Sequence, residues 1–222
     1  SLKTQKVKDV IERIGHQNPD LVKPALGPKE PWAYRNKMQM PVGGTKGNIQ
    51  MGFYAMGSHD IVQGTNCPIQ DEGNNIIAQA CYQIAKEFDI EPYDEHTGKG
   101  VLRHIIGRIG QSGWMIILVT ATEQLPHKEK WVEKLTERIP QVETIVHNVN
   151  GKRTNVILGP KNNILYGDGT ITDHIKDLRF TLSPHSFFQV NPEQTTVLYD
   201  QALAYADLKG DETVIDAYCG TG

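Results

Sequence analysis

The sequence predicts an α+β domain followed by the first helix–strand unit of a doubly wound α/β domain. Segments with helical and with strand periodicity alternate along the 222 residues without an internal repeat, which is typical of an α+β fold. Glycines join neighbouring alternating segments into hairpins. Near the carboxyl end a capped helix leads into an apolar strand and a glycine turn, as at the start of a doubly wound domain. We expect an N-terminal helix and linker over residues 1–25, the α+β domain over 26–183 and the start of the α/β domain over 184–222.

Apolar periodicity predicts the elements of the first half of the chain. Val7, Val10 and Ile14 repeat at helical spacing, and Gly15 follows as a natural helix end. Two alternating segments enclose a glycine-rich turn, which favours a hairpin. The expected elements are a helix over Lys3–Ile14, strands over Trp32–Pro41 and Asn48–Met56, and a helix over Asn74–Phe88.

The second half of the chain contains a further hairpin and a further helix. Gly110 and Gly113 lie in the turn between two apolar segments, which predicts the hairpin. Pro140 ends an amphipathic segment and marks the end of the helix. The expected elements are strands over Val101–Ile109, Trp114–Ala121, Val142–Val149, Ile164–Gly167 and Leu178–Leu182, and a helix over Lys128–Ile139.

The α/β unit begins with helix-start signals. Asn191 is a good N-cap, Pro192 suits the first helical position, and Gln194 occupies the capping-box position. These residues predict a helix over 192–206, and the apolar segment Thr213–Tyr218 predicts the strand that follows it.

Composition indicates a globular, cytoplasmic protein. No segment approaches the roughly 20 apolar residues of a membrane span, so we expect no membrane partner. Three scattered cysteines argue against a disulfide scaffold, and the eight histidines show no zinc-site spacing. The net charge of −3 argues against a generally basic nucleic-acid binder. No protein partner is implied.

A small basic strip interrupts this acidic average. Arg35, Lys37 and Lys46 have no neighbouring Asp or Glu in the sequence. The strip could contact phosphate, or it could be the solvated surface of a strand.

The end of the chain has the character of a cofactor loop. The segment Asp216–Gly222 places a Gly-x-Gly turn directly after an apolar strand, where backbone N–H groups can approach a nucleotide-like ligand. The helix that should follow is absent from the sequence. We therefore interpret the chain as a fragment that stops within the loop.

Several blocks together resemble the RNA uracil-5-methyltransferase family, which makes 5-methyluridine. The resemblance covers nearly the whole chain in the family's order. It implies a Rossmann-like methyltransferase domain that uses S-adenosylmethionine, and an N-terminal RNA-binding barrel that this chain lacks. The matching blocks are Tyr34-Arg-Asn-Lys37 with Pro41-Val-Gly43, Cys67-Pro68, Leu102-Arg-His104, Ser186-Phe-Phe-Gln-Val-Asn191 and Asp216-Ala-Tyr-Cys-Gly220.

The resemblance also implies a mechanism. A cysteine thiolate adds to carbon 6 of uracil, carbon 5 takes the methyl group, and a glutamate removes the carbon 5 proton. In the family both catalytic residues lie downstream of the cofactor loop, so we expect no catalytic residue within this chain and no activity from it alone. Cys219 is then a small filler of the loop, and Cys81 a core residue.

Site residues follow from the same resemblance. The RNA-binding candidates are Arg35, Lys37 and Phe187, whose ring could stack on a base or simply pack. Cys67 matches the fourth ligand of a four-iron–four-sulfur cluster, whose other ligands would precede Ser1. The expected cofactor-binding residues are Gln189, Tyr218, Asp216, Gly220 and Gly222.

The match at Cys67 favours ribosomal RNA as the substrate, because cluster-bearing relatives belong to that branch. A transfer RNA enzyme is the first alternative. A non-catalytic RNA-binding relative is the second.

Overall fold

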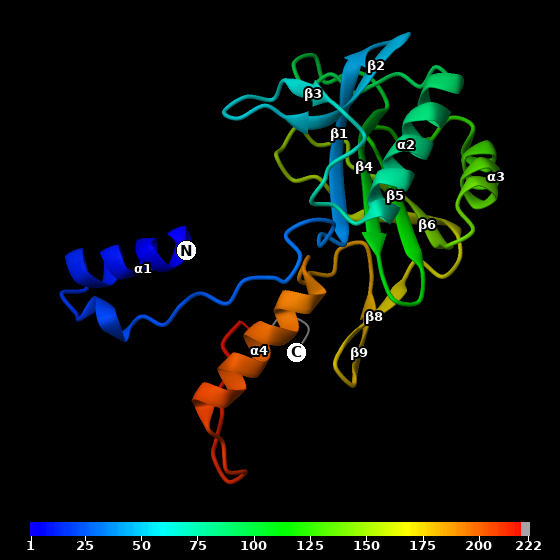
Figure 1. The fold of residues 1–222 in the computed structure, drawn as a ribbon. Coiled ribbons are helices and arrows are strands. Elements are labelled where there is room, and N and C mark those ends of the chain that lie inside the picture. Colours follow the sequence, from blue (N-terminus) through cyan, green and yellow to red (C-terminus); the bar gives the residue numbers. More distant parts are fainter. Residues whose placement is uncertain (219–222) are drawn as a thin grey trace.

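A computed structural model describes residues 1–218, and a seven-stranded sheet forms its centre. The strand order is β3-β2-β1-β4-β5-β6-β7, and neighbouring strands are antiparallel except for the parallel pair β5–β6 (Figure 1). The strands are β1 (Lys37–Thr45), β2 (Asn48–Tyr54), β3 (Ile61–Gln63), β4 (Leu102–Ile109), β5 (Trp114–Thr120), β6 (Val142–Val149) and β7 (Lys161–Tyr166).

Two helices cover one face of the sheet. Helix α2 (Glu72–Glu87) packs against β4 and β1, and α3 (Lys128–Arg138) forms the crossover between the parallel strands β5 and β6 (Figure 1). Gly107 in β4 allows α2 to approach closely, because a Cβ there would lie 2.4 Å from Asn74 Oδ1. The main core lies between these helices and the sheet; it includes Met38, Met40, Ile77, Ile84, Ile105, Ile116 and Trp131, which are all fully buried.

The opposite face of the sheet is covered only in part. A separate hairpin, β8 (Ile171–Ile175) and β9 (Leu178–Leu182), and the segment after it lie against this face. A second apolar cluster forms between them; it comprises Ile106, Met115, Ile117, Val119, Val146, Ile171, Leu182 and Phe188.

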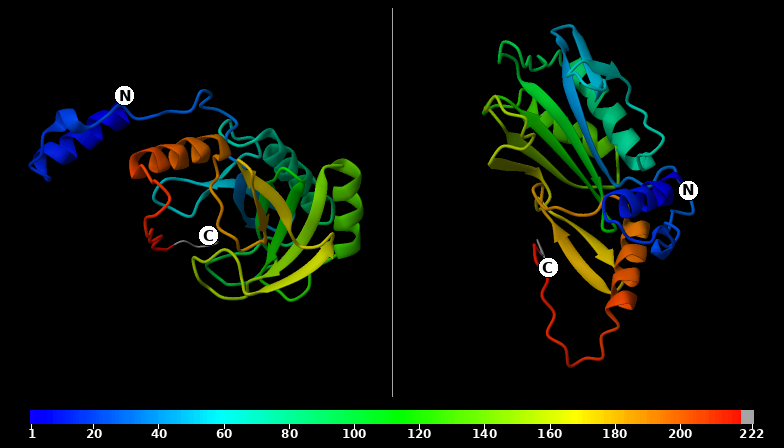
Figure 2. Two further views of the ribbon diagram at one scale, coloured as in Figure 1. Left: turned by 90° about the horizontal axis from the view of Figure 1, so that it is seen from below. Right: turned by 90° about the vertical axis from the view of Figure 1, so that its left-hand side faces the viewer.

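The first and last helices project from the sheet (Figure 2). Helix α1 (Leu2–Arg13) buries none of its residues and packs mainly on the 3-10 turn η1 (Pro19–Leu21). Helix α4 (Pro192–Ala206) buries only Thr195. None of the helices described by the structure combines the length and apolar character that crossing a bilayer requires.

Most expected elements are confirmed, with shifted ends. Asn191 caps α4 as expected, since its Oδ1 accepts a hydrogen bond from the backbone N–H of Gln194 at 3.0 Å. The strand expected over Trp32–Pro41 begins only at Lys37 and continues to Thr45. Strands β3 and β8 are short and were not expected.

One expected element is wrong. No strand forms over Thr213–Tyr218 within the described residues, and Val214 and Ile215 are exposed. A strand needs a neighbour that pairs with its backbone N–H and C=O groups, and none of the described strands pairs with this segment. The domain boundaries at residues 25 and 184 remain predictions.

Candidate nucleic-acid interface

The candidate site lies where β1 and β4 pair, on the sheet face opposite α2 and α3. Lys37 pairs with Arg108 and Pro41 with His104 across the two strands. Side chains alternate along a strand, and the intervening Met38, Met40 and Ile105 belong to the helix-covered core. The polar members of these pairs therefore project to the other face.

Arg35, Lys37 and Arg108 form a cation cluster. None of the ion pairs among the described residues involves any of the three. Burial, and then the charges of Arg108 and Arg35, lower the pKa of Lys37 to about 8. Burial lowers the pKa of Arg108 to about 10. Like charges directly opposite each other destabilise a sheet, so this cluster suits an anionic ligand such as phosphate.

The backbone of Arg35 is held at the start of α2. Its carbonyl accepts hydrogen bonds from the N–H of Asp71 at 2.9 Å and from Asn74 Nδ2 at 3.1 Å. Asp71 also caps α2 through its side chain. The position of Arg35 is therefore fixed by the helix.

Segment 183–190, which contains the Phe-Phe-Gln-Val block, crosses the end of the β1–β4 pair. Nη2 of Arg108 donates to the carbonyl oxygens of Pro184 at 3.3 Å and Ser186 at 2.5 Å. The N–H of Asn36 donates to the carbonyl of Val190 at 2.9 Å. Arg108 thus attaches the block to the sheet.

Sequence reasoning missed Arg108. The available signal was an arginine within a strand of four apolar residues, and it does not separate Arg108 from Arg103 on the same strand. Such a residue is rarely buried without partners, so it indicates a polar contact from another part of the chain.

The two phenylalanines of the block have different environments. Phe188 is buried, with its ring centroid 5.6 Å from that of Phe180. Phe187 is 75% exposed, so its ring is accessible for stacking.

The expected cofactor residues are not brought together by the described structure. Gln189 is half-buried beside the cation cluster, and its carbonyl lies 3.5 Å from Asn36 Nδ2. Asp216 and Tyr218 are exposed, and no hydrogen bond among the described residues joins them to Gln189. Gly220 and Gly222, together with Cys219, lie outside the described residues.

The described cysteines differ in environment. Cys81 is fully buried in the core, as expected, and burial raises the pKa of its thiol. Cys67 is half-buried, and its backbone N–H donates to Asn75 Oδ1 at 3.0 Å. Within residues 1–218, no group of three or more His, Cys, Asp or Glu side chains could hold a metal ion.

Arg103 and His104, neighbours on β4, differ in their contacts. Arg103 Nη1 donates to the carbonyls of Asn150 at 2.6 Å and Lys152 at 2.8 Å, and its guanidinium lies 4.4 Å from the ring centroid of Tyr93. This arginine is structural. His104 lines a cavity of about 390 Å³ together with Arg35.

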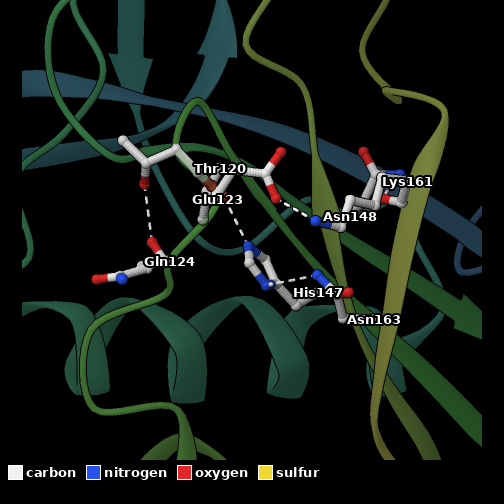
Figure 3. A network of polar contacts seen from close by, with 8 residues as sticks. Thr120, Glu123, Gln124, His147, Asn148, Lys161 and Asn163 are labelled. Carbon is white, nitrogen blue, oxygen red and sulfur yellow. Dashed lines mark hydrogen bonds and ion pairs between the residues drawn. The ribbon is translucent and has the colours of Figure 1, made fainter.

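A polar network at the other end of the sheet is also structural (Figure 3). His147 Nε2 lies 2.7 Å from Thr120 Oγ1, and its Nδ1 lies 3.4 Å from Asn163 Nδ2. Asn148 Nδ2 donates to the carbonyl of Gly159 at 2.8 Å, and the same carbonyl lies 3.0 Å from His185 Nε2. This network therefore reaches the segment that carries the Phe-Phe-Gln-Val block.

Comparisons with known proteins agree with the sequence resemblance. No family model matches the chain. It is 49% identical over 222 residues to a protein of Halalkalibacterium halodurans named as an uncharacterized RNA methyltransferase, covering 99% of this chain and 48% of that protein. A protein of Clostridium tetani with the same name is 47% identical over 224 residues, covering 100% and 48%.

A solved structure shares the fold. It is the tRNA (uracil-54, C5)-methyltransferase of Pyrococcus abyssi in complex with S-adenosyl-L-homocysteine, with a TM-score of 0.64 and 21% identity. The match covers 79% of this chain and 42% of that chain. These similarities confirm the resemblance to the RNA methyltransferases, and the chain spans about half the length of the curated relatives that it matches.

Proposed function

We propose that the protein transfers the methyl group of S-adenosylmethionine to carbon 5 of a uridine in RNA, with ribosomal RNA as the substrate. The observation that carries the proposal is the 49% identity, over 99% of the chain, to a protein named as an RNA methyltransferase. The fold shared with a tRNA uracil methyltransferase bound to S-adenosyl-L-homocysteine supports the choice of base and of cofactor.

In this proposal the residues beside the cation cluster bind RNA. Arg35 and Lys37 contact phosphate, because a cationic pair without carboxylate partners attracts the backbone of a nucleic acid. Phe187 stacks on a base through its exposed ring. Arg108 positions Phe187 and Gln189 because it holds the backbone that directly precedes them, at Pro184 and Ser186, against the sheet.

S-adenosylmethionine supplies the methyl group, and residues of the α/β unit bind it. Gln189 offers a side-chain amide on a segment that the sheet fixes through Asn36. Asp216 and Tyr218, with Gly220 and Gly222, form the rest of the proposed cofactor site.

An iron–sulfur cluster does not fit the described residues. A four-iron–four-sulfur cluster takes four thiolate ligands, whereas within residues 1–218 Cys67 is accompanied only by the fully buried Cys81. We assign no part of the reaction to a cluster. Cys67 remains a candidate for a single ligand in the intact protein.

The proposed function is tested with the full-length protein and S-adenosylmethionine labelled at its methyl group. Ribosomal RNA and transfer RNA transcripts serve as substrates, and digested nucleosides are separated by mass spectrometry. We expect labelled 5-methyluridine from ribosomal RNA. Label in transfer RNA alone would show that transfer RNA, not ribosomal RNA, is the substrate. Label on another nucleoside would refute the uracil assignment. RNA binding without label would support the non-catalytic alternative.

The lowered pKa of Lys37 predicts a pH-dependent affinity for RNA. The ammonium form binds phosphate, so affinity is complete below about pH 8 and falls as Lys37 loses its proton. Between about pH 7 and about pH 9 we expect a three- to tenfold loss, since a tenth of the side chain remains charged one unit above its pKa. Fluorescence anisotropy with a labelled RNA measures this change.

Two variants provide controls for this measurement. Lys37→Arg keeps its charge over the whole range and should bind RNA with little pH dependence. Lys130→Arg, on the exposed side of α3, should behave like the wild type. An undiminished pH dependence in Lys37→Arg would exclude Lys37 as a phosphate ligand.

A further inference from the structure

The cavity beside the cation cluster has features of a built ligand site. It lies among β1, β2, β4 and the turn that precedes α2, and its volume of about 390 Å³ is within the range of small-molecule sites. Arg35, Gln39, Tyr54, Cys67, Gln70 and His104 line it together with apolar side chains.

Two buried polar atoms at this cavity lack hydrogen-bond partners. Gln70 is only 2% exposed, His104 is 6% exposed, and neither Gln70 Oε1 nor His104 Nδ1 has a partner among residues 1–218. Unpaired buried polar atoms are rare because each costs the free energy of its lost hydration. Gln70 and His104 both line the cavity, so two polar side chains with unused hydrogen-bonding capacity lie in its wall, which indicates a polar ligand.

The chemistry of these groups matches a nucleobase. Amide and imidazole groups form hydrogen bonds with the edges of adenine and uracil, which carry both donors and acceptors. Burial lowers the pKa of His104 to about 4, so at neutral pH its imidazole is uncharged and offers one donor and one acceptor. None of the Asp and Glu side chains that the structure describes lines the cavity.

An aromatic ring of fixed orientation completes the wall. The hydroxyl of Tyr54 donates to Glu95 Oε1 at 3.2 Å, and its ring stacks on His59 with centroids 4.8 Å apart. Such a ring binds an unstacked base with little loss of its own conformational freedom.

We propose that this cavity receives one unpaired nucleobase of the RNA substrate, hydrogen-bonded to Gln70 and His104 beside the ring of Tyr54. The inference rests on the proposed function, and it adds a base-recognition site on the sheet. Arg35 belongs to both the cavity and the cation cluster. A nucleotide whose base lies in the cavity therefore has its phosphate backbone next to the cation cluster.

The test compares Gln70→Met with the wild type in the full-length protein. Methionine has a similar shape but cannot hydrogen-bond to a base, and it removes an unpartnered buried atom. We expect unchanged or higher stability of the RNA-free protein in denaturant. We also expect a 3- to 30-fold weaker affinity for ten-nucleotide single-stranded RNAs of uridine or adenosine, corresponding to the loss of one or two hydrogen bonds.

An abasic oligomer of the same length separates base recognition from backbone binding. Gln70→Met and the wild type should bind this abasic oligomer with the same affinity. Gln79→Met, on the exposed surface of α2, should change neither affinity. His104→Asn is a second variant with the same expected pattern of RNA affinities.

Two results would overturn the proposal. One is an affinity of Gln70→Met for both base-bearing RNAs within twofold of the wild type. The other is an equal loss for the abasic oligomer. Lower stability of Gln70→Met with unchanged RNA affinity would show that another segment of the protein fills the cavity. Methyl transfer is measured separately, so loss of this site and failure of the proposed function are distinguishable.

Discussion

Arg108→Ala in the full-length protein should reduce methyl transfer at least tenfold and destabilise the fold. The variant removes the donor that holds the carbonyls of Pro184 and Ser186, so the block containing Phe187 and Gln189 loses its attachment to β4. A hydrogen bond to a charged group contributes about 1.5–3 kcal/mol. Part of this is offset because the repulsion between Arg108 and Lys37 disappears. We expect a net loss of about 1–3 kcal/mol in the free energy of unfolding.

The measurement combines denaturant unfolding with methyl-transfer kinetics. Arg108→Lys keeps the charge but lacks the guanidinium fork, so its activity should lie between those of Arg108→Ala and the wild type. Arg138→Ala, at the partly exposed end of α3, is a matched control and should leave activity unchanged. A positioning role also predicts weaker binding of S-adenosylmethionine by Arg108→Lys. Wild-type affinity and rate in both Arg108 variants would contradict it.

Acid should destabilise the protein through His104, by up to about 3 kcal/mol between pH 6.5 and pH 4. Burial lowers the pKa of His104 from 6.5 to about 4 in the folded protein, whereas the unfolded chain keeps the ordinary value. Between these values the unfolded chain binds a proton that the folded protein does not. The contribution of His104 to the free energy of unfolding is therefore complete above about pH 6.5. It is lost as the pH falls, at about 1.4 kcal/mol per pH unit.

Denaturant unfolding at several pH values isolates this contribution by comparison with His104→Asn. Carboxylates contribute in both proteins, so the difference between the two curves reports His104. We expect that difference to shrink as the pH falls from about 7 to about 4. His16→Asn, on an exposed turn after α1, should parallel the wild type. Parallel curves for His104→Asn and the wild type would show that His104 takes up its proton without cost in the folded protein.

Local features of the fold were predictable from the sequence. Asn191 and Pro192 begin α4 because a side-chain cap and a fixed φ act within one turn of the chain. The hairpins were predictable because glycines mark the turns between alternating segments. The segment Thr213–Tyr218 is apolar enough for a strand, but a strand also requires a neighbour, and its own residues do not reveal one.

The candidate site depends on contacts between distant parts of the chain. The pairing of Lys37 with Arg108 joins strands that are separated in sequence by β2, β3 and α2. Arg35, Gln70 and His104 lie on three segments that are separated in the sequence, and the fold brings them to one cavity. Arg35 and Lys37 could be selected by charge alone, whereas Arg108 and Gln70 could not be selected before their burial was known.

The order of the strands has a consequence for folding and for local opening. Strands β1–β3 and β4–β7 are each assembled from sequence neighbours, and the β1–β4 pair joins these two halves. Bringing distant segments together costs loop-closure entropy, so we expect docking of preformed halves to limit the folding rate. Local opening between β1 and β4 separates Lys37 from Arg108 and Pro41 from His104 in one event, while each half keeps its own strand pairs. A ligand that binds across the β1–β4 pair therefore slows amide hydrogen exchange in β1 and β4 more than in the other strands.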